Sequence, residues 1–364
     1  LDYNYIAGTY NRFPIVLRHG KGSLAYDENE KAYIDLSSGI AVNTFGFADE
    51  AWQTAVNAQL GTLQHTSNLY YSEPCALLAS MLCEKTGMQK VFFSNSGAEA
   101  NECAIKVARK YAQEKKGKEY YHIITLQNSF HGRTITTLAA TGQEVFHRDF
   151  TPLTEGFHYV AAGDLDGVKK LLDPSPPAAV MIEIVQGEGG VIPLEKAFVK
   201  DLSVLLCARD VLLICDEVQI GNGRSGMLYG YMHYGIRPDI FTTAKGLGGG
   251  LPLGATVLGE KVKDVLTPGT HGSTFGGNPV CCAGAVSVLS RLDEETLAGV
   301  RMRSDYIVGE LTGAAGVRSV TGLGLMLGVE TERPAADVIR DCIEKGVLVI
   351  SAKGKVRLLP ALNI

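Results

Sequence analysis

The stretch Leu212-Leu-Ile-Cys-Asp-Glu-Val-Gln219 decides the fold class. A short apolar run without alternating polar residues is typical of a strand that is buried on both faces of a parallel sheet. The run ends in two carboxylates, Asp216 and Glu217. Taken alone, Asp216 could equally cap a helix. In a parallel sheet, however, the carboxyl end of a strand borders the crevice where ligands bind, and we expect the two carboxylates there.

Other buried-strand patterns occur at Val91–Phe93, His122–Thr125 and Ala179–Ile184, separated by amphipathic runs such as Glu99–Gln113. Strands that alternate with helices indicate an α/β fold, with a mostly parallel sheet between two layers of helices. Glycine clusters follow several of these strands, and glycine lets the backbone approach a ligand closely. The sequence therefore predicts a ligand site at the glycine-rich ends of the strands.

The chain divides into three regions. Residues 1–45 hold short alternating patterns around a turn, which indicate a small sheet. Residues 46–275 carry the α/β pattern and form the expected large domain. Residues 276–364 run from an Ala/Val-rich helix into short strands and form a small domain, which we expect to be incomplete at its end. No low-complexity linker separates the regions, so we expect them to pack closely.

Composition excludes several classes of protein. The 364 residues are 46% hydrophobic, which is enough for a sizeable core, and the net charge of −5 offers no basic face for nucleic acid. No apolar run is long enough to cross a bilayer, and residues 1–9 lack a secretory signal pattern. The eight cysteines show no C-x-x-C pair and no metal-ligand spacing. We therefore expect a cytoplasmic protein with free thiols and no metal site.

A lysine suggests the chemistry. Lys245 lies between the apolar stretch Phe241–Ala244 and the glycine loop Gly246–Gly250. Burial lowers the pKa of an amine, and such a lysine can form a Schiff base. A surface lysine would be the simpler interpretation of Lys245 alone. Pyridoxal chemistry, however, needs one lysine for the aldehyde and one carboxylate to keep the pyridine nitrogen protonated, so Lys245 and Asp216 together predict that cofactor.

Two further stretches suit the same cofactor. Phe93-Ser-Asn-Ser-Gly-Ala-Glu-Ala-Asn101 follows a predicted strand and opens a helix. Backbone N–H groups at a helix N-terminus behind a glycine form an anion site, although a capped turn would look the same. Asn128-Ser-Phe-His-Gly-Arg-Thr134 supplies an aromatic face and a guanidinium group, although it could also be an exposed loop.

Five motifs in this order resemble those of the class III aminotransferases, and more narrowly those of the acetylornithine aminotransferases, with which the succinylornithine transaminases overlap. The motifs are Ser96–Asn101, Phe130–Arg133, Asp216–Gln219, Thr243–Gly246 and Gly272–Pro279. The resemblance covers nearly the whole chain. It implies the type I fold of pyridoxal-phosphate transferases, in which a large domain with a mostly parallel seven-stranded sheet is joined by a smaller α+β domain built from both chain ends.

The resemblance also implies the cofactor contacts. Lys245 would carry pyridoxal 5'-phosphate and move the proton, and Asp216 would pair with the pyridine nitrogen. The other expected cofactor-binding residues are Gly97 and Ala98 at the phosphate, Phe130 and Val218 on the two ring faces, Gln219 at the ring hydroxyl, and Glu217 beside them. Thr274 would reach the phosphate of the neighbouring subunit, which implies a homodimer.

The substrate residues follow from the same resemblance. Arg133 would hold the α-carboxylate of an ornithine derivative, and Arg357 that of glutamate. Glu188 would pair with Arg357 and mask it during the first half-reaction. Ser273 would lie close to the substrate. Gly39 stands where ornithine δ-aminotransferases carry a tyrosine, and it leaves room for an acyl group.

We therefore expect transamination of N2-acetyl-L-ornithine with 2-oxoglutarate, giving N-acetyl-L-glutamate 5-semialdehyde and L-glutamate, a step of arginine biosynthesis. Succinylornithine, ornithine and 4-aminobutyrate stay open as alternative substrates, and so does a glutamate-semialdehyde aminomutase. A ligand-sensing module of a transcription regulator would need a DNA-binding domain and a basic face, neither of which the sequence offers.

Overall fold

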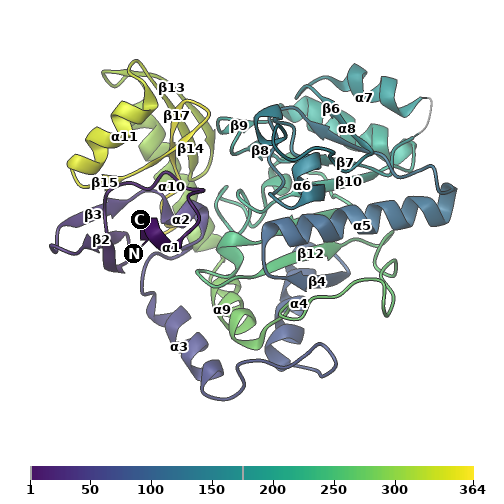
Figure 1. The fold of residues 1–364 in the computed structure, drawn as a ribbon, viewed down its shortest axis with the longest axis horizontal. Helices are drawn as coiled ribbons and strands as arrows, with labels where there is room; N and C mark the ends of the chain where they lie inside the picture. The colour runs from purple at the N-terminus through teal and green to yellow at the C-terminus, as the bar shows by residue number, and fades with distance from the viewer. Residues whose placement is uncertain (1, 174–175) are drawn as a thin grey trace.

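The computed structural model describes residues 2–173 and 176–364. Its centre is a seven-stranded sheet (Figure 1). The strands are, in spatial order, β4 (Lys90–Ser94), β12 (Gly254–Leu258), β11 (Ile240–Thr243), β10 (Leu212–Asp216), β7 (Ala179–Ile182), β5 (Ile123–Leu126) and β6 (Phe157–Val160). Only β12 runs antiparallel to its two neighbours, so the prediction of a mostly parallel seven-stranded sheet is confirmed.

Strands β6 and β12 were not predicted from the sequence. The edge strand β6 contains His158 and the exposed Tyr159, so it lacks the apolar run of a central strand. Strand β12 begins at Gly254 in a glycine-rich stretch that reads as a loop. Both segments therefore form strands because they pair with neighbouring strands of the sheet, and not because their own sequence pattern favours a strand.

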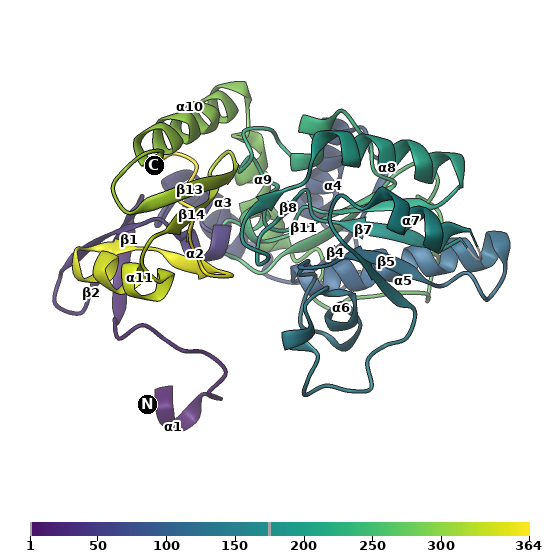
Figure 2. The ribbon, with the colours of Figure 1, turned by 90° about the horizontal axis from the view of Figure 1, so that it is seen from above.

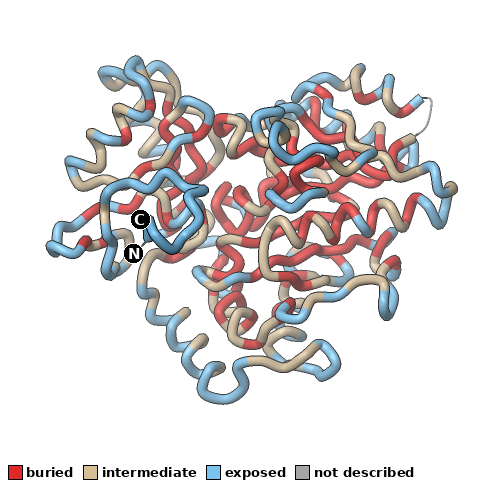
Figure 3. The backbone as a smooth tube through the Cα atoms, in the orientation of Figure 1, coloured by how far each residue is buried: buried red, intermediate tan, exposed pale blue. Residues whose placement is uncertain are grey.

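Helices cover both faces of this sheet, as the view in Figure 2 shows. On β10 and β7, alternate side chains point to opposite faces. Leu212 and Ile214 pack with helix α5 (Gly97–Lys116), whereas Leu213 and Cys215 pack with helix α8 (Lys196–Ala208). The buried residues in Figure 3 accordingly concentrate in and around the sheet. The run Leu212–Asp216 is buried at every position, as its composition predicts.

The other helices and short elements of this part surround the sheet. They are α3 (Glu50–Leu60), α4 (Glu73–Thr86), α6 (Ile135–Ala140), α7 (Leu165–Leu172), α9 (Pro279–Ser290), the 3-10 turns η1 (Glu144–Phe146), η2 (Gly230–Tyr234) and η3 (Lys245–Leu247), and the paired strands β8 (Val185–Gln186) and β9 (Ile192–Pro193). Helices α3 and α9 lie below the sheet in the view of Figure 1.

Two small sheets and helices at both chain ends form the remainder of the described residues. One sheet has the order β1 (Leu17–Lys21), β2 (Leu24–Asp27), β3 (Ala32–Asp35) and β15 (Val347–Leu348), and the other has β13 (Val317–Leu323), β14 (Met326–Thr331), β17 (Lys355–Leu358) and β16 (Ile350–Ala352). The helices are α10 (Glu294–Leu311) and α11 (Ala335–Glu344), and the N-terminal part also holds α1 (Asp2–Tyr5) and α2 (Ser38–Ala41).

Strand β15 pairs in parallel with β3, so the two chain ends share a sheet, and the purple and yellow segments of Figure 1 lie side by side. The domain boundaries near residues 45 and 275 stay a prediction. Within residues 2–173 and 176–364, no helix is both long enough and apolar enough to cross a membrane.

The packing of α8 on the sheet predicts a large loss of stability for Leu202→Ala. Leu202 is 0% exposed, and removing its side chain should leave a cavity that lowers the free energy of unfolding by about 2–5 kcal/mol. Val204→Ala on the same helix is the control, because Val204 is 71% exposed and its truncation should change stability by no more than about 0.5 kcal/mol. Urea denaturation of both variants measures the difference, and equal midpoints would contradict this packing.

Candidate active site

A cavity of about 630 Å³ opens at the carboxyl ends of β10 and β11. This is the edge of the sheet at which the sequence predicts ligand binding. Eight of the predicted site residues line the cavity: Gly97, Ala98, Phe130, Arg133, Asp216, Val218, Gln219 and Lys245. They come from segments that are far apart in the chain and that meet only because their strands are neighbours in one sheet.

Asp216 ends strand β10 and is only 5% exposed. Asn101 Nδ2 donates a hydrogen bond to Asp216 Oδ2 over 2.8 Å, and His131 Nδ1 lies 2.8 Å from the same oxygen. The backbone N–H of Val218 donates to Oδ1 over 3.0 Å. These donors compensate the carboxylate for the water that it loses on burial. The carboxyl group of Asp216 is therefore held at a fixed point in the wall of the cavity.

Asn101 and His131 belong to predicted motifs, but neither of them was assigned a role from the sequence. Asn101 Nδ2 also donates to the carbonyl oxygen of His131 over 2.7 Å, and the hydroxyl of Thr242 donates to Asn101 Oδ1 over 2.7 Å. Asn101 thus joins helix α5, strand β11 and Asp216. A buried asparagine one turn inside a helix was the available signal, because such a side chain needs hydrogen-bond partners.

Lys245 follows strand β11 and opens the turn η3. Burial lowers the pKa of its amine to about 8; the Glu188 carboxylate opposes this shift, and the Arg357 charge adds to it. A large fraction of the amine is therefore neutral near pH 8, as a nucleophile requires. The backbone of Lys245 has φ of 45°, a left-handed conformation that costs a lysine free energy and is common at functional sites.

An anion site lies at the start of α5. The side chain of Ser96 caps the helix by accepting a hydrogen bond from the N–H of Glu99 over 3.2 Å. The N–H groups of Gly97 and Ala98 belong to the first turn, where a helix offers no internal acceptor. A Cβ atom at Gly97 would lie 2.6 Å from Val218 Cγ1, so only glycine fits beside Val218. The tight approach brings the helix N-terminus to the cavity wall.

Glu188 and Arg357 form an ion pair at the boundary between the large sheet and the small domain. Glu188 follows strand β8, and Arg357 lies on strand β17. Arg357 Nη1 lies 2.5 Å from Glu188 Oε1 and donates to Gln219 Oε1 over 3.0 Å. Burial alone would raise the pKa of Glu188, but the charge of Arg357 and its hydrogen bond outweigh burial and lower it. Arg357 is 3% exposed, so these two acceptors offset the free-energy cost of burying its charge.

Arg133 is exposed and borders the same cavity. Its guanidinium carbon lies 4.2 Å from the ring centroid of Phe146 and 5.6 Å from that of Phe130. The two aromatic rings hold the guanidinium group by cation–π contacts and leave its N–H groups available to a ligand. The sequence analysis did not identify Phe146, because it lies in η1, outside the motif of Arg133.

Two other cavity residues were also missed. Tyr10 reaches the cavity from the N-terminal segment, which lies far from the motifs in sequence. Glu183 follows strand β7 and accepts a hydrogen bond from the N–H of Phe130 over 2.9 Å. Burial raises the pKa of Glu183 to about 7, and the nearby His131 opposes the shift. Glu183 lies in an apolar run, and its position in the sequence carries no signal of a site.

Glu217 does not line the cavity, contrary to its prediction as a cofactor-binding residue. Its carboxylate accepts hydrogen bonds from the N–H groups of Gly230 and Tyr231, over 2.7 and 2.8 Å. Burial raises the pKa of Glu217 to about 8. Neighbouring residues of an extended segment point in opposite directions, so Asp216 can face the cavity only if Glu217 faces the protein interior.

Ser273, Thr274 and Gly39 also lie outside this cavity in the single chain, and so do Glu188 and Arg357, which contact it through Gln219. Ser273 Oγ accepts hydrogen bonds from Asn95 Nδ2 over 3.2 Å and from the N–H of Gly276 over 3.0 Å. Thr274 is exposed on the surface. Gly39 is exposed with φ of 65°, and a Cβ atom there would approach no atom closer than 3.6 Å.

The residues of the cavity suit pyridoxal phosphate. The N-terminus of α5 offers N–H groups for a phosphate, Asp216 offers a buried carboxylate for a pyridinium nitrogen, and Lys245 offers an amine of lowered pKa for an aldehyde. His131 lines the same cavity, and its Nε2 is buried without a hydrogen-bond partner among the described residues. Phe130 and Val218 supply apolar surfaces at the same cavity.

Comparison with known proteins agrees with this arrangement. An acetylornithine aminotransferase from Haemophilus ducreyi is 50% identical over 100% of this chain and 93% of its own length. A succinylornithine transaminase from Salmonella paratyphi A is 44% identical over 99% of this chain and 90% of its own. The crystal structure of the ornithine aminotransferase from Toxoplasma gondii superposes with a TM-score of 0.94 and 32% identity, covering 100% of this chain and 89% of that one.

The family model for class III aminotransferases matches residues 5–364. Enzymes of this family depend on pyridoxal phosphate, and solved structures of similar transaminases contain it. The extent of the family match and the contents of the cavity lead to one conclusion: the chain belongs to the class III aminotransferases.

Proposed function

We propose that this aminotransferase moves the distal amine of N2-acetyl-L-ornithine to 2-oxoglutarate and forms N-acetyl-L-glutamate 5-semialdehyde and L-glutamate. The observation that carries the proposal is a pair of unlike arginines: Arg133 lines the cavity, and Arg357 lies behind the cavity residue Gln219, to which it donates a hydrogen bond. Arg357 is buried and paired with Glu188, whereas the described part of the chain places no carboxylate within ion-pair distance of Arg133. Each arginine can bind a carboxylate, but one is already paired with a carboxylate of the chain and the other is not. Such a difference suits an enzyme that accepts two different substrates in turn.

Bound pyridoxal phosphate would supply an electron sink for the carbon that loses its proton. The Lys245 amine, with its pKa lowered to about 8, would hold the cofactor between turnovers and then carry a proton as general base and acid. Asp216 would keep a proton on the ring nitrogen by its negative charge, and Asn101 and His131 would hold that carboxylate in place. Gly97 and Ala98 would bind the phosphate, Gln219 would reach the ring hydroxyl, and Phe130 and Val218 would enclose the ring.

In the first half-reaction, Arg133 would bind the α-carboxylate of the ornithine derivative while Glu188 covers Arg357. In the second, the carboxylate of 2-oxoglutarate would replace Glu188 on Arg357. Gln219 hydrogen-bonds both members of the pair, so it would remain a partner of Arg357 after the exchange. The free-energy cost of this exchange should be small, because one carboxylate replaces another and Arg357 keeps a negatively charged partner throughout.

The acylated substrate is favoured over free ornithine by Gly39. Gly39 lies outside the cavity of the single chain, and we propose that an acyl group extending from the substrate occupies the open space around it. The absence of a tyrosine hydroxyl at this position removes one polar partner for a free α-amine. The sequence relatives that carry the names acetylornithine aminotransferase and succinylornithine transaminase support the same preference. The role we propose is in arginine biosynthesis in the cytoplasm.

We also propose a homodimer in which Thr274 reaches the phosphate of the neighbouring site. Large apolar side chains near Thr274 support an interface there: Phe275 is 59% exposed, and Leu69 is 88% exposed. Asn68 Nδ2 joins the two segments by donating to the carbonyl oxygens of Ser273 and Gly276, over 3.0 and 2.9 Å. Exposed apolar groups that gather in one place mark a surface for association.

The lowered pKa of Lys245 predicts how cofactor loading depends on pH. The neutral amine is the reactive form, so the loading rate of the cofactor-free chain should rise with pH and reach half its maximum near pH 8, the value to which burial lowers the pKa. Glu188→Gln removes the carboxylate that raises this pKa most and should move the midpoint lower. The visible absorbance of the bound cofactor measures loading; Lys245→Ala is the control and should give no such band. A midpoint near that of a free lysine would contradict the assignment.

The two arginines should affect opposite half-reactions. Arg133→Ala should slow the reaction of acetylornithine with the pyridoxal form by at least tenfold, about 1.4 kcal/mol, and leave the reaction of glutamate nearly unchanged. Arg357→Ala should do the opposite. Single-turnover absorbance changes with each amine donor measure both rates. Equal losses in both half-reactions for either variant would rule out separate carboxylate sites.

A panel of amine donors with 2-oxoglutarate tests the substrate. Acetylornithine should give a higher kcat/KM than ornithine and 4-aminobutyrate, and Gly39→Tyr should reduce the ratio of acetylornithine to ornithine, because the phenol fills the space of the acyl group. Succinylornithine in the same panel shows which acyl group is preferred. A higher kcat/KM for 4-aminobutyrate than for either acylated ornithine would contradict our proposal and indicate a 4-aminobutyrate transaminase.

A further inference from the structure

The segment Ala244–Gly250 that carries Lys245 has little stiffness of its own. Four of its seven residues are glycines, which restrict the backbone least. Lys245 itself has φ of 45°, and Gly249 and Gly250 also have positive φ. A flexible segment in unfavourable conformations keeps one geometry only if its surroundings hold it there. The contacts around this segment therefore decide where the Lys245 amine lies.

Three side chains donate hydrogen bonds to alternate carbonyl groups of the segment. Asn222 Nδ2 donates to the oxygen of Ala244 over 3.1 Å. The Thr44 hydroxyl donates to that of Gly246 over 2.7 Å. Trp52 Nε1 donates to that of Gly248 over 3.0 Å. The three donors come from different parts of the chain, and their acceptors lie on both sides of Lys245, so they fix the segment at three points.

Thr44 and Asn222 are themselves held rigidly. Thr44 is 2% exposed, and the N–H of Leu362 donates to its carbonyl oxygen over 2.8 Å. Asn222 is 3% exposed, and its amide also donates to the hydroxyl of Thr243 over 2.9 Å. A Cβ atom on Gly246 would lie 2.9 Å from the Thr44 hydroxyl oxygen, so the hydroxyl touches the backbone directly. Neither donor can swing away without leaving a buried polar group unpaired.

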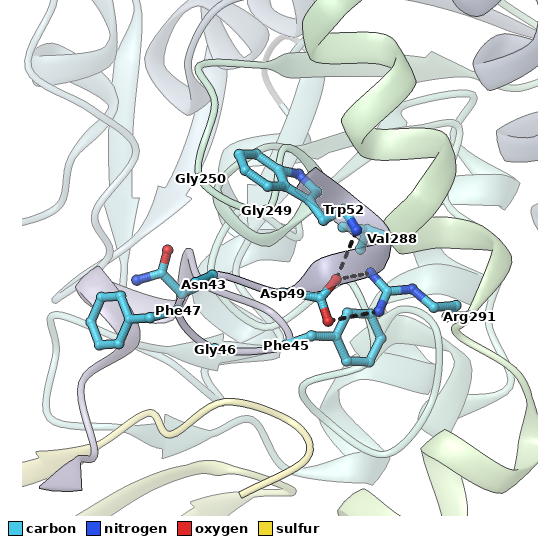
Figure 4. Close-up of a pocket in the computed structure, with 11 residues that line it drawn as sticks. Asn43, Phe45, Gly46, Phe47, Asp49, Trp52, Gly249, Gly250, Val288 and Arg291 are labelled. Atoms are coloured by element: carbon cyan, nitrogen blue, oxygen red, sulfur yellow. Dashed lines mark hydrogen bonds and ion pairs between the residues drawn. The ribbon is translucent and has the colours of Figure 1, made fainter. Parts of the chain in front are cut away.

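Trp52 holds the far end of the segment from helix α3 (Figure 4). The carboxylate of Asp49 caps this helix by accepting a hydrogen bond from the N–H of Trp52 over 2.9 Å. The same carboxylate pairs with Arg291, whose nitrogens lie 2.7 and 3.0 Å from its two oxygens. The guanidinium group of Arg291 lies over the ring of Phe45 at 4.1 Å. The Asp49–Arg291 ion pair connects the first turn of α3 to the end of α9. It thereby fixes the position of the Trp52 indole next to Gly249.

The indole is in direct contact with the segment. A Cβ atom on Gly249 would lie 2.8 Å from Trp52 Nε1, and one on Gly250 would lie 3.7 Å from the ring. Gly250 borders both the small pocket of Figure 4 and the active-site cavity. The segment is thus a thin wall, with Trp52 behind it and the cavity in front.

We propose that Thr44, Trp52 and Asn222 are positioning residues, which hold the backbone on both sides of Lys245 so that its amine keeps one place in the cavity. This inference rests on the proposed function, because it assigns Lys245 the central chemical role. None of the three needs to touch a substrate. Their contribution should therefore enter the rate of the chemical step and leave substrate binding nearly unchanged.

Matched substitutions separate positioning from general stability. Thr44→Val removes the hydroxyl at nearly constant volume, whereas Thr44→Ser keeps it. Thr54→Val is the control, because the Thr54 hydroxyl donates to a carbonyl of its own exposed helix and lies away from the segment. Trp52→Phe removes the indole N–H and keeps an aromatic ring. Trp52 is the only tryptophan of the chain, so its emission in the unsubstituted protein reports on this wall directly.

The first measurement needs no cofactor. Lys245 of the full-length chain is labelled by reductive methylation at a series of pH values and followed by mass spectrometry. Thr44→Val and Trp52→Phe should move the midpoint of labelling upward from that of the parent, because a freed amine gains water and its pKa returns towards its ordinary value. Thr44→Ser and Thr54→Val should keep the parental midpoint.

The second measurement uses the cofactor-loaded enzyme. Thr44→Val and Trp52→Phe should lower kcat by roughly tenfold with little change in KM, as expected for a misplaced catalytic group. A parental labelling midpoint and a parental kcat in both variants, with only the melting temperature lowered, would overturn the positioning role. If the parent bound no pyridoxal phosphate, the proposed function would fail, and the labelling midpoints would still decide whether Thr44 and Trp52 position Lys245.

Discussion

The buried carboxyl group of Asp216 is the constraint on which the site depends. A carboxylate can remain ionised inside a protein only if donors replace its water. Here Asn101 and His131 supply two of them, and both must arrive from other segments. The end of β10, the first turns of α5 and the loop before α6 are therefore fixed relative to one another. Lys245 follows the adjacent strand β11, so it shares this frame.

The two halves of the cavity have different supports. The side that suits the cofactor is made of strand ends and a helix N-terminus, whose positions follow from the sheet. The side where we propose that substrates bind has Arg133 on a loop and Tyr10 on the N-terminal segment, with Arg357 behind it on strand β17. Loops can change without disturbing a core, whereas strand ends cannot. The rigid half supports the chemistry common to the family, and the adaptable half allows different amines to be accepted.

A residue of the site could be predicted where its neighbours in the sequence form a recognisable pattern. Asp216 and Lys245 follow recognisable strands, so the fold and the edge of the sheet were predictable from the chain itself. Glu217 shares a motif with Asp216, but adjacent residues face opposite ways, and its carboxylate binds the N–H of Gly230 instead of facing the cavity. The supports of the Lys245 segment escaped prediction because Thr44 and Trp52 meet it across about two hundred residues of sequence. Side-chain hydrogen bonds over such separations leave no periodic pattern to detect.

Helix α5 has a consequence for how this enzyme can vary. Its first turn presents Gly97 and Ala98, and one turn later Asn101 binds Asp216. A helix advances about 1.5 Å per residue, so the separation between the two anchoring points is a constant of peptide geometry. An inserted or deleted residue between them would rotate Asn101 away from Asp216 by about 100°. Length changes in related chains should therefore be absent from residues 97–101 and tolerated in the loops that face the substrate.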